Sequence, residues 1–88
     1  MSDRFLVLVA RPNDLGVTRV GYSVGRRIGK AVVRNKAKRR LREAVRLTPV
    51  QDGWDLVFIA RKEASLADFH RLSRSVTGLC RRAGILVT

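Results

Sequence analysis

The residues best suited to chemistry in this sequence are cationic, and they are concentrated in one stretch. They recur at intervals of four, in a row that consists of Arg34, Lys38, Arg42 and Arg46, with Asn35 and Arg39 beside it. Side chains four residues apart lie on one face of an α-helix, so the spacing predicts a cationic helix face. Guanidinium and ammonium groups bind phosphate oxygens through charge-assisted hydrogen bonds. The chemistry predicted for this row is recognition of a polyanion.

The row is poorly explained as a solvated helix face. Like charges four residues apart destabilise a helix by about 0.2–0.5 kcal/mol per pair. Solvated faces usually mix signs, whereas Glu43 is the one acidic residue here that can offset Arg39 or Arg46. Helices that bind membrane surfaces carry Trp, Phe or Leu in excess, and the apolar side of this one has Val, Ala and Leu. We therefore expect a nucleic-acid-binding role and no membrane partner.

Residues that could support catalysis in the protein itself do not form a pattern. His70 is the only histidine, and no nucleophile or orienting partner accompanies it. The acidic residues Asp14, Asp52, Asp55 and Glu63 are scattered. We expect no catalytic residue and no metal site, with His70 a partly exposed helix residue.

Composition limits the remaining possibilities. The chain has 88 residues with 19 Lys plus Arg against 7 Asp plus Glu, a formal charge of +12. A chain of this length forms one domain, predicted to span 1–88, and such an excess of charge favours a nucleic-acid partner. Cys80, the only cysteine, cannot form an internal disulfide and is expected in the core. With no signal peptide and no apolar run of about 20 residues, a soluble cytoplasmic protein is predicted.

The first half of the chain predicts two strands, a loop and a helix. Residues 5–10 and 17–24 alternate or are apolar, and the turn residues between them favour an antiparallel hairpin. The glycine-bounded basic loop at 25–29 leads into a helix over 31–47. The apolar stripe of that helix is expected at Val33, Ala37, Leu41, Ala44 and Val45.

The second half predicts a strand and a helix. Residues 56–60 are continuously apolar, which is typical of a central strand. Ser65 and Asp68 form a capping-box pattern for the following helix, and Gly84 is placed to end it. The apolar stripe of this helix is expected at Leu66, Phe69, Leu72, Val76, Leu79 and Ala83. The order β-β-α-β-α is that of a two-layer α+β sandwich with both helices on a small sheet.

Two long stretches of the sequence carry a resemblance to a known family. Residues 19–39, which run from a strand through the basic loop into the Arg34-Asn35-Lys36 motif, resemble the signature of the bacterial ribonuclease P protein component. Residues 55–65 resemble the central strand of that family and its exit. The resemblance implies a ribosomal-protein-like α/β sandwich.

The resemblance also implies a function. In that ribonucleoprotein an RNA subunit, with Mg²⁺ held mainly by RNA, cleaves the 5′ leader from precursor tRNA. The protein assists this hydrolytic endonuclease by binding ribonuclease P RNA and precursor tRNA, and binds no cofactor itself. The RNA-contacting residues would be Arg26, Arg27, Arg34, Asn35, Lys36, Lys38, Arg39, Arg42 and Arg46. The cleft for the single-stranded leader would include Leu6, Leu8 and Tyr22, although Tyr22 alternates with Val20 and Val24 and is also a core candidate.

The sequence departs from the family in two places. Lys36 stands where the family has a second arginine, which keeps the charge but loses the planar fork. The family's basic first helix, whose phenylalanines line the leader cleft, is missing from the expected element order, because Met1 stands directly before the first strand. We therefore expect weaker leader binding than RNA-subunit binding.

Two other functions remain open from the sequence. A structural ribosomal protein of similar fold would bind ribosomal RNA, and it would co-purify with that RNA instead of a single ribozyme-sized species. A nuclease in its own right would cleave without any RNA partner.

Overall fold

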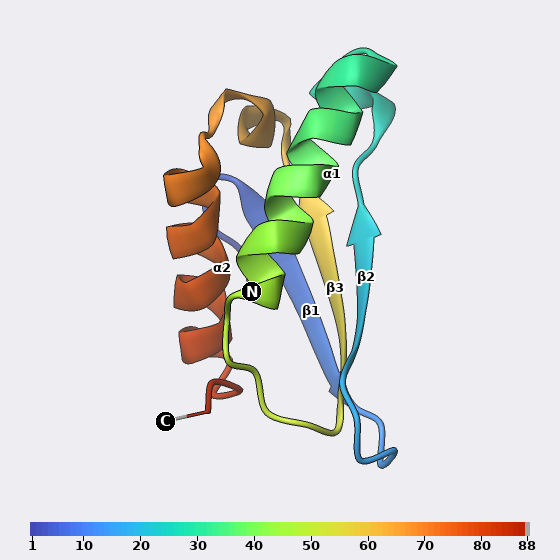
Figure 1. The fold of residues 1–88 in the computed structure, drawn as a ribbon, viewed down its shortest axis with the longest axis vertical. Helices are drawn as coiled ribbons and strands as arrows, with labels where there is room; N and C mark the ends of the chain where they lie inside the picture. The colour runs from blue at the N-terminus through green and yellow to red at the C-terminus, as the bar shows by residue number, and fades with distance from the viewer. Residues whose placement is uncertain (88) are drawn as a thin grey trace.

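The computed structural model describes residues 1–87 and contains three strands and two α-helices in two layers (Figure 1). The strands and α-helices, in chain order, are β1 (Leu6–Pro12), β2 (Arg19–Ser23), α1 (Ala31–Arg46), β3 (Trp54–Ala60) and α2 (Phe69–Arg82). Two 3-10 helices, η1 (Arg26–Ile28) and η2 (Lys62–Leu66), precede α1 and α2. The predicted β-β-α-β-α order and the α+β class are confirmed.

The sheet has the order β1-β3-β2, so β3 is the central strand as predicted. β1 pairs antiparallel to β3, with Leu6 opposite Ala60 and Leu8 opposite Phe58. β2 pairs parallel to β3, with Tyr22 also opposite Phe58. The predicted antiparallel hairpin of the first two strands is therefore wrong. The apolar β3 takes the buried position between them, where both of its edges are hydrogen-bonded, and residues 13–18 connect β1 to β2 past its end.

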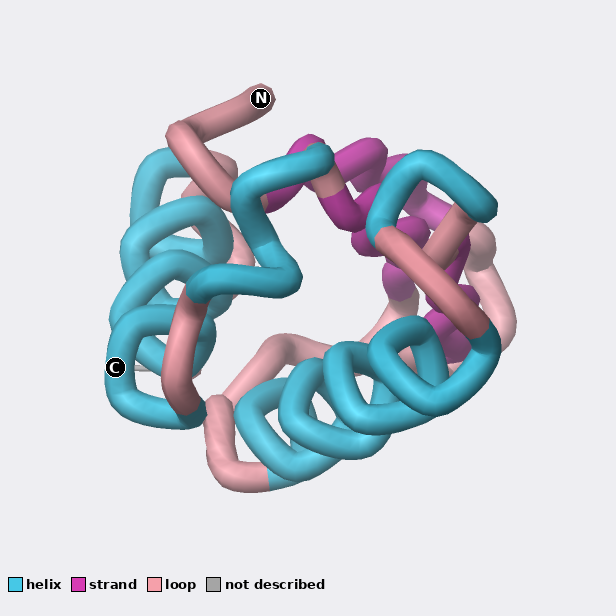
Figure 2. The backbone as a smooth tube through the Cα atoms, turned by 90° about the horizontal axis from the view of Figure 1, so that it is seen from above, coloured by secondary structure: helices cyan, strands magenta, loops and turns pink. Residues whose placement is uncertain are grey.

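Both helices cover the same face of the sheet, and the view from above places them on adjacent sides of the core (Figure 2). Even-numbered strand residues face them, so Leu6 and Leu8 are 0% and 2% exposed and pack with Leu56 and Phe58. Odd-numbered residues lie on the opposite face, which no helix of residues 1–87 covers, and Val9 and Val57 are exposed there. The expectation that Leu6 and Leu8 line an open leader cleft is wrong, because the helices bury these side chains.

Helix α1 is capped by Lys30 and preceded by Gly29, whose φ of 142° disfavours any other residue and where a Cβ would lie only 3.2 Å from Val33. Its buried residues are Ala37, Leu41, Ala44 and Val45. Val33, expected on the same stripe, is exposed. Burial starts at Ala37 because the first turns of α1 project beyond the core (Figure 1).

Helix α2 starts later than the capping-box pattern predicted. Ser65 lies inside η2, and the N-cap of α2 is Asp68, whose carboxylate accepts a hydrogen bond from the Arg71 amide at 2.9 Å. Leu66, expected on the apolar stripe, precedes the helix and is exposed. Gly84 follows the helix with a φ of 73°, the left-handed conformation that ends helices. The predicted stop at Gly84 is confirmed, whereas the predicted cap at Ser65 is wrong.

Candidate nucleic-acid interface

The exposed side of α1 brings three of the predicted cations together with Asn35. Asn35, Lys38, Arg39 and Arg42 line one shallow depression along this helix. Ala37, Leu41 and Ala44 anchor the other side of α1 in the core, and the charged row is thus held on a rigid element. The described residues contain three ion pairs within 4 Å, and none involves Lys38, Arg39 or Arg42. These three charges are therefore available to an anionic partner.

Arg34, at the start of the row, has one buried donor that is not satisfied within the described residues. Its Nε is buried and donates to no acceptor among residues 1–87. A buried donor without a partner costs about 1–3 kcal/mol.

Lys36 and Arg40 are on the side of α1 that faces η2. Both line a separate depression that also includes Ser65. Arg40 donates from Nη1 to the Ala67 carbonyl oxygen at 3.3 Å, so this side chain ties α1 to the segment before α2. The structure therefore does not group Lys36 with the depression formed by Asn35, Lys38, Arg39 and Arg42.

Arg46, at the C-terminal end of the row, is paired inside the chain. Its guanidinium donates two hydrogen bonds to the Glu43 carboxylate, at 3.0 and 2.5 Å. The hydrogen bond from Arg46 lowers the pKa of Glu43, and the pKa of Arg46 is raised in turn. Arg46 thus presents less net charge to a partner than Arg42 does.

Tyr22 lies on the helix-covered face of β2, next to the cationic row. Its ring stacks on the buried Phe58 with centroids 6.4 Å apart, and the Arg42 guanidinium lies over it at 5.9 Å. Partial burial raises the pKa of the Tyr22 hydroxyl, and the charge of Arg42 opposes that shift. Tyr22 is consequently half-buried, and its ring lies beside Arg42, which lines the α1 depression.

Arg26 and Arg27 form η1, immediately before α1. Arg27 lines a depression with Arg4, Arg61, Lys62 and Glu63 at the end of β3. The basic loop thus extends the cationic surface from α1 towards η2. Arg61 and Lys62 were not among the predicted contact residues, although they directly follow the central strand.

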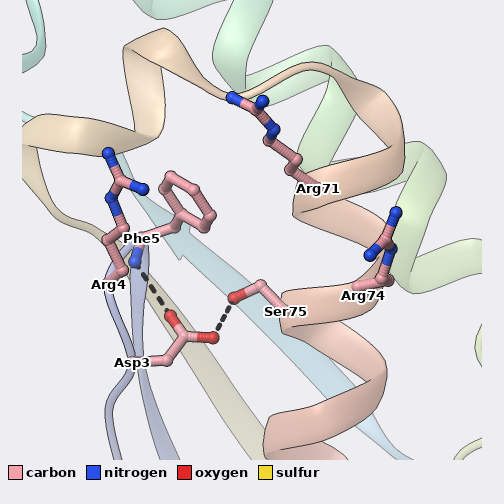
Figure 3. A pocket seen from close by; sticks show the side chains of 6 residues that line it. All are labelled: Asp3, Arg4, Phe5, Arg71, Arg74 and Ser75. Carbon is pink, nitrogen blue, oxygen red and sulfur yellow. Dashed lines mark hydrogen bonds between the residues drawn. The ribbon is translucent and has the colours of Figure 1, made fainter.

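A further group of cations that the sequence analysis did not single out is carried by α2. Arg71 and Arg74 border a depression with Arg4 and Phe5, above the Asp3–Ser75 hydrogen bond (Figure 3). The signal was present in the sequence, since residues 69–82 contain four arginines and no acidic residue. It was overlooked because the arginines do not form one continuous row at intervals of four.

The other residues with chemical potential are structural. Cys80 is fully buried, and burial raises the pKa of its thiol to about 11. His70 is exposed on α2 and contacts Phe69 edge to face at 6.0 Å. Among residues 1–87, no three His, Cys, Asp or Glu side chains lie close enough to hold a metal ion. No helix in this part of the chain is long and apolar enough to cross a membrane.

A two-layer α+β domain with arginines and lysines aligned on one exposed helix face has the features of an RNA-binding protein. The family model described as Ribonuclease P matches residues 1–84. A relative from Caldanaerobacter subterraneus subsp. tengcongensis, named "Ribonuclease P protein component", is 45% identical over 84 residues, which cover 93% of this chain and 72% of the relative. One from Thermoanaerobacter sp. (strain X514), with the same name, is 43% identical and covers 90% and 70%.

Solved structures agree with these sequence matches. The Staphylococcus aureus RNase P protein superposes with a TM-score of 0.86 at 28% identity, covering 99% of this chain and 82% of that one. The RNase P protein from Thermotoga maritima gives 0.84 at 33% identity, with coverage of 93% and 80%. The chain belongs to the ribonuclease P protein family, which confirms the resemblance stated from the sequence.

Proposed function

We propose that this chain is the RNA-binding protein subunit of ribonuclease P and assists the catalytic RNA in removing the 5′ leader from precursor tRNA. The observation that carries the proposal is the α1 face with Lys38, Arg39 and Arg42 unpaired within residues 1–87. The family membership supplies the partner, ribonuclease P RNA. The whole of 1–88 acts as one domain in this role, and the cytoplasm is where it meets its RNA.

The contribution of the protein is electrostatic. Lys and Arg side chains that neutralise phosphates release condensed counterions, and this release favours assembly of the complex. Lower repulsion between catalytic RNA and substrate also lets Mg²⁺ ions bind to the RNA at lower bulk concentration. The Mg²⁺ ions are held mainly by RNA, and no side chain of this protein takes part in bond cleavage.

The leader cannot bind at Leu6 and Leu8, where the sequence predicted its cleft. Because Leu6 and Leu8 are buried, they cannot contact a nucleotide. Tyr22, with Arg42 over its ring, is the aromatic group next to the α1 depression. We place the leader beside Tyr22, where a base can pack against the exposed part of its ring.

The test is reconstitution with a bacterial ribonuclease P RNA at low Mg²⁺. Precursor-tRNA cleavage should be faster with the protein than without it, and Arg42→Ala should reduce the gain. Arg11→Ala is the matched control, because Arg11 is an exposed arginine on the helix-free face of the sheet. Equal rates with and without the protein would refute the proposal. If the protein instead binds ribosomal RNA more tightly than ribonuclease P RNA, the structural ribosomal role is indicated.

A further inference from the structure

The outward face of α2 forms a second cationic surface, distinct from the row on α1. The α2 surface, as defined here, consists of His70, Arg71, Arg74, Gly78 and Arg81. At 100° per residue, Arg74 and Arg81 lie within about 20° of each other, on the side of the helix opposite to the buried Leu72 and Leu79. Arg74 borders two depressions, one with Arg71 and Phe5 and one with His70, Ser73, Thr77 and Arg81.

The charges of this surface are only partly offset within the described residues, where the pKa of Asp68 is lowered by the hydrogen bond from the Arg71 amide and by the charges of Arg71, His70 and Arg74. Within residues 1–87, the ion pairs at 4 Å or less include none of Arg71, Arg74 or Arg81. The nearest acidic groups have other partners. The Asp3 carboxylate accepts from the Phe5 and Leu6 amides, both at 2.9 Å, and from the Ser75 hydroxyl (Figure 3). Asp68 caps the first turn of α2 through the Arg71 amide.

A second observation, independent of charge, is the glycine in the middle of α2. Glycine weakens a helix interior relative to alanine by about 1 kcal/mol. Within residues 1–87 no packing contact explains Gly78, because a Cβ built there meets no atom within 4 Å. The glycine lies beside Arg74 and Arg81, one turn from each, and leaves the helix backbone open to close approach.

These features together fit the phosphate backbone of RNA. Arginine binds phosphate oxygens with two parallel donors, and the hydroxyls of Ser73 and Thr77 can add further donors in the same depression. A missing side chain at Gly78 allows the backbone to lie against the helix. Arg82 donates from Nη1 to the Ser2 carbonyl oxygen at 3.1 Å, whereas Arg71 and Arg74, three residues apart, repel each other unless an anion binds between them.

We propose that the α2 surface binds a second segment of RNA backbone, so that the protein joins two RNA segments through α1 and α2. The two helices lie on adjacent sides of the core, so their exposed faces point in different directions (Figure 2). One continuous backbone on α1 therefore does not also cover Arg74 and Arg81. The inference rests on the proposed function only in that the partner is RNA.

The first test measures binding of ribonuclease P RNA between 50 and 200 mM salt. Each phosphate contact contributes about 0.7–0.9 to the slope of log affinity against log salt. The double variant Arg74→Ala/Arg81→Ala should lower the slope by about 1.4–1.8, so the change in affinity over this range shrinks about seven- to twelvefold. Arg11→Ala, on the helix-free face, should leave the slope unchanged.

The outcomes separate this inference from the proposed function. An unchanged slope in the α2 double variant, with a lowered slope in Arg42→Ala, overturns the inference and leaves the proposed function in place. If neither variant changes the slope, both are wrong.

The second test uses Gly78→Gln, which separates stability from binding. Glutamine favours helix more than glycine does, and space is available for its Cβ. The melting temperature should therefore rise or stay constant, while affinity for ribonuclease P RNA falls because the side chain obstructs the backbone. Unchanged affinity in a variant that is at least as stable would show that no RNA approaches this helix face.

Discussion

The α1 row allows a quantitative prediction, because the structure separates its unpaired cations from its paired one. Lys38 and Arg42 have no acidic partner within 4 Å in the described residues, and Arg34 carries a buried donor without an acceptor. Arg46, by contrast, is hydrogen-bonded twice to Glu43. Removing the first three charges should therefore affect RNA binding strongly, and removing the fourth should affect it weakly.

The magnitude follows from counterion release. If each of Arg34, Lys38 and Arg42 contacts one phosphate, the triple alanine variant loses about 2.1–2.7 from the slope of log affinity against log salt. When salt is raised fourfold, from 50 to 200 mM, the affinity of the triple variant should therefore fall by a factor about 20- to 40-fold smaller than the factor for the unmodified protein. Arg46→Ala should lower the slope by less than about half a unit, and Glu43→Gln should raise it by exposing the full charge of Arg46.

The assay is equilibrium binding of ribonuclease P RNA at several salt concentrations, with circular dichroism to verify the fold of each variant. Arg34→Ala should not reduce stability, because it removes an unsatisfied donor. If Arg46→Ala lowers the slope as much as Arg42→Ala does, the ion pair with Glu43 does not screen Arg46 and the reasoning fails. An unchanged slope in the triple variant would mean that the row faces solvent.

Four other predictions concern the rest of the chain. Asp3→Ala should lower the free energy of unfolding by about 2–3 kcal/mol, because the Asp3 carboxylate accepts three hydrogen bonds. A loss below about 0.5 kcal/mol in urea titrations would contradict these contacts. The pKa of Asp55 is lowered from 3.8 to about 2, chiefly by the hydrogen bond from Arg19. The stabilising effect of the Asp55 carboxylate is therefore complete above about pH 4 and is lost as the pH falls towards 2. Asp55→Asn should flatten the pH dependence of the free energy of unfolding in this window, and an unaltered profile would count against the ion pair with Arg19. The Cys80 thiol, buried and with a pKa raised to about 11, should react with a disulfide reagent only as fast as the protein opens, whereas rapid labelling of the native state would be inconsistent with its burial. Protein free of RNA should leave precursor tRNA intact, and cleavage that disappears in His70→Ala would disprove the assignment of catalysis to RNA.

Elements with one dominant signal could be predicted from the sequence. The 3.6-residue periodicity located α1, and the continuous apolar run located β3 as the central strand. The sequence pattern gave the wrong answer where two neighbouring residues were equally suitable, as at the N-terminus of α2. Ser65 and Asp68 are both capping residues, and only the η2 turn, which depends on tertiary packing, makes Asp68 the cap.

The candidate site could be predicted in outline for the same reason. The row on α1 follows from spacing alone, whereas the pairing of Arg46 with Glu43 and the contact of Arg40 with Ala67 depend on side-chain conformation. The face of β1 was ambiguous because Val7 and Val9 are as apolar as Leu6 and Leu8. A period of two then gives two alternating sets without indicating which set the helices bury.

The central position of β3 has a consequence for synthesis of the chain. β1 and β2 both pair with β3 and not with each other, so neither strand has this partner until Ala60 has been added. At roughly 5–20 residues per second, the interval from Ser23 to Ala60 lasts about 2–7 seconds. During that time the nascent chain exposes two strand edges, together with the cationic stretch that precedes β3. Folding of the sheet is therefore delayed until most of the chain has been synthesised. In that interval an RNA would bind the cationic segment while it is still unfolded.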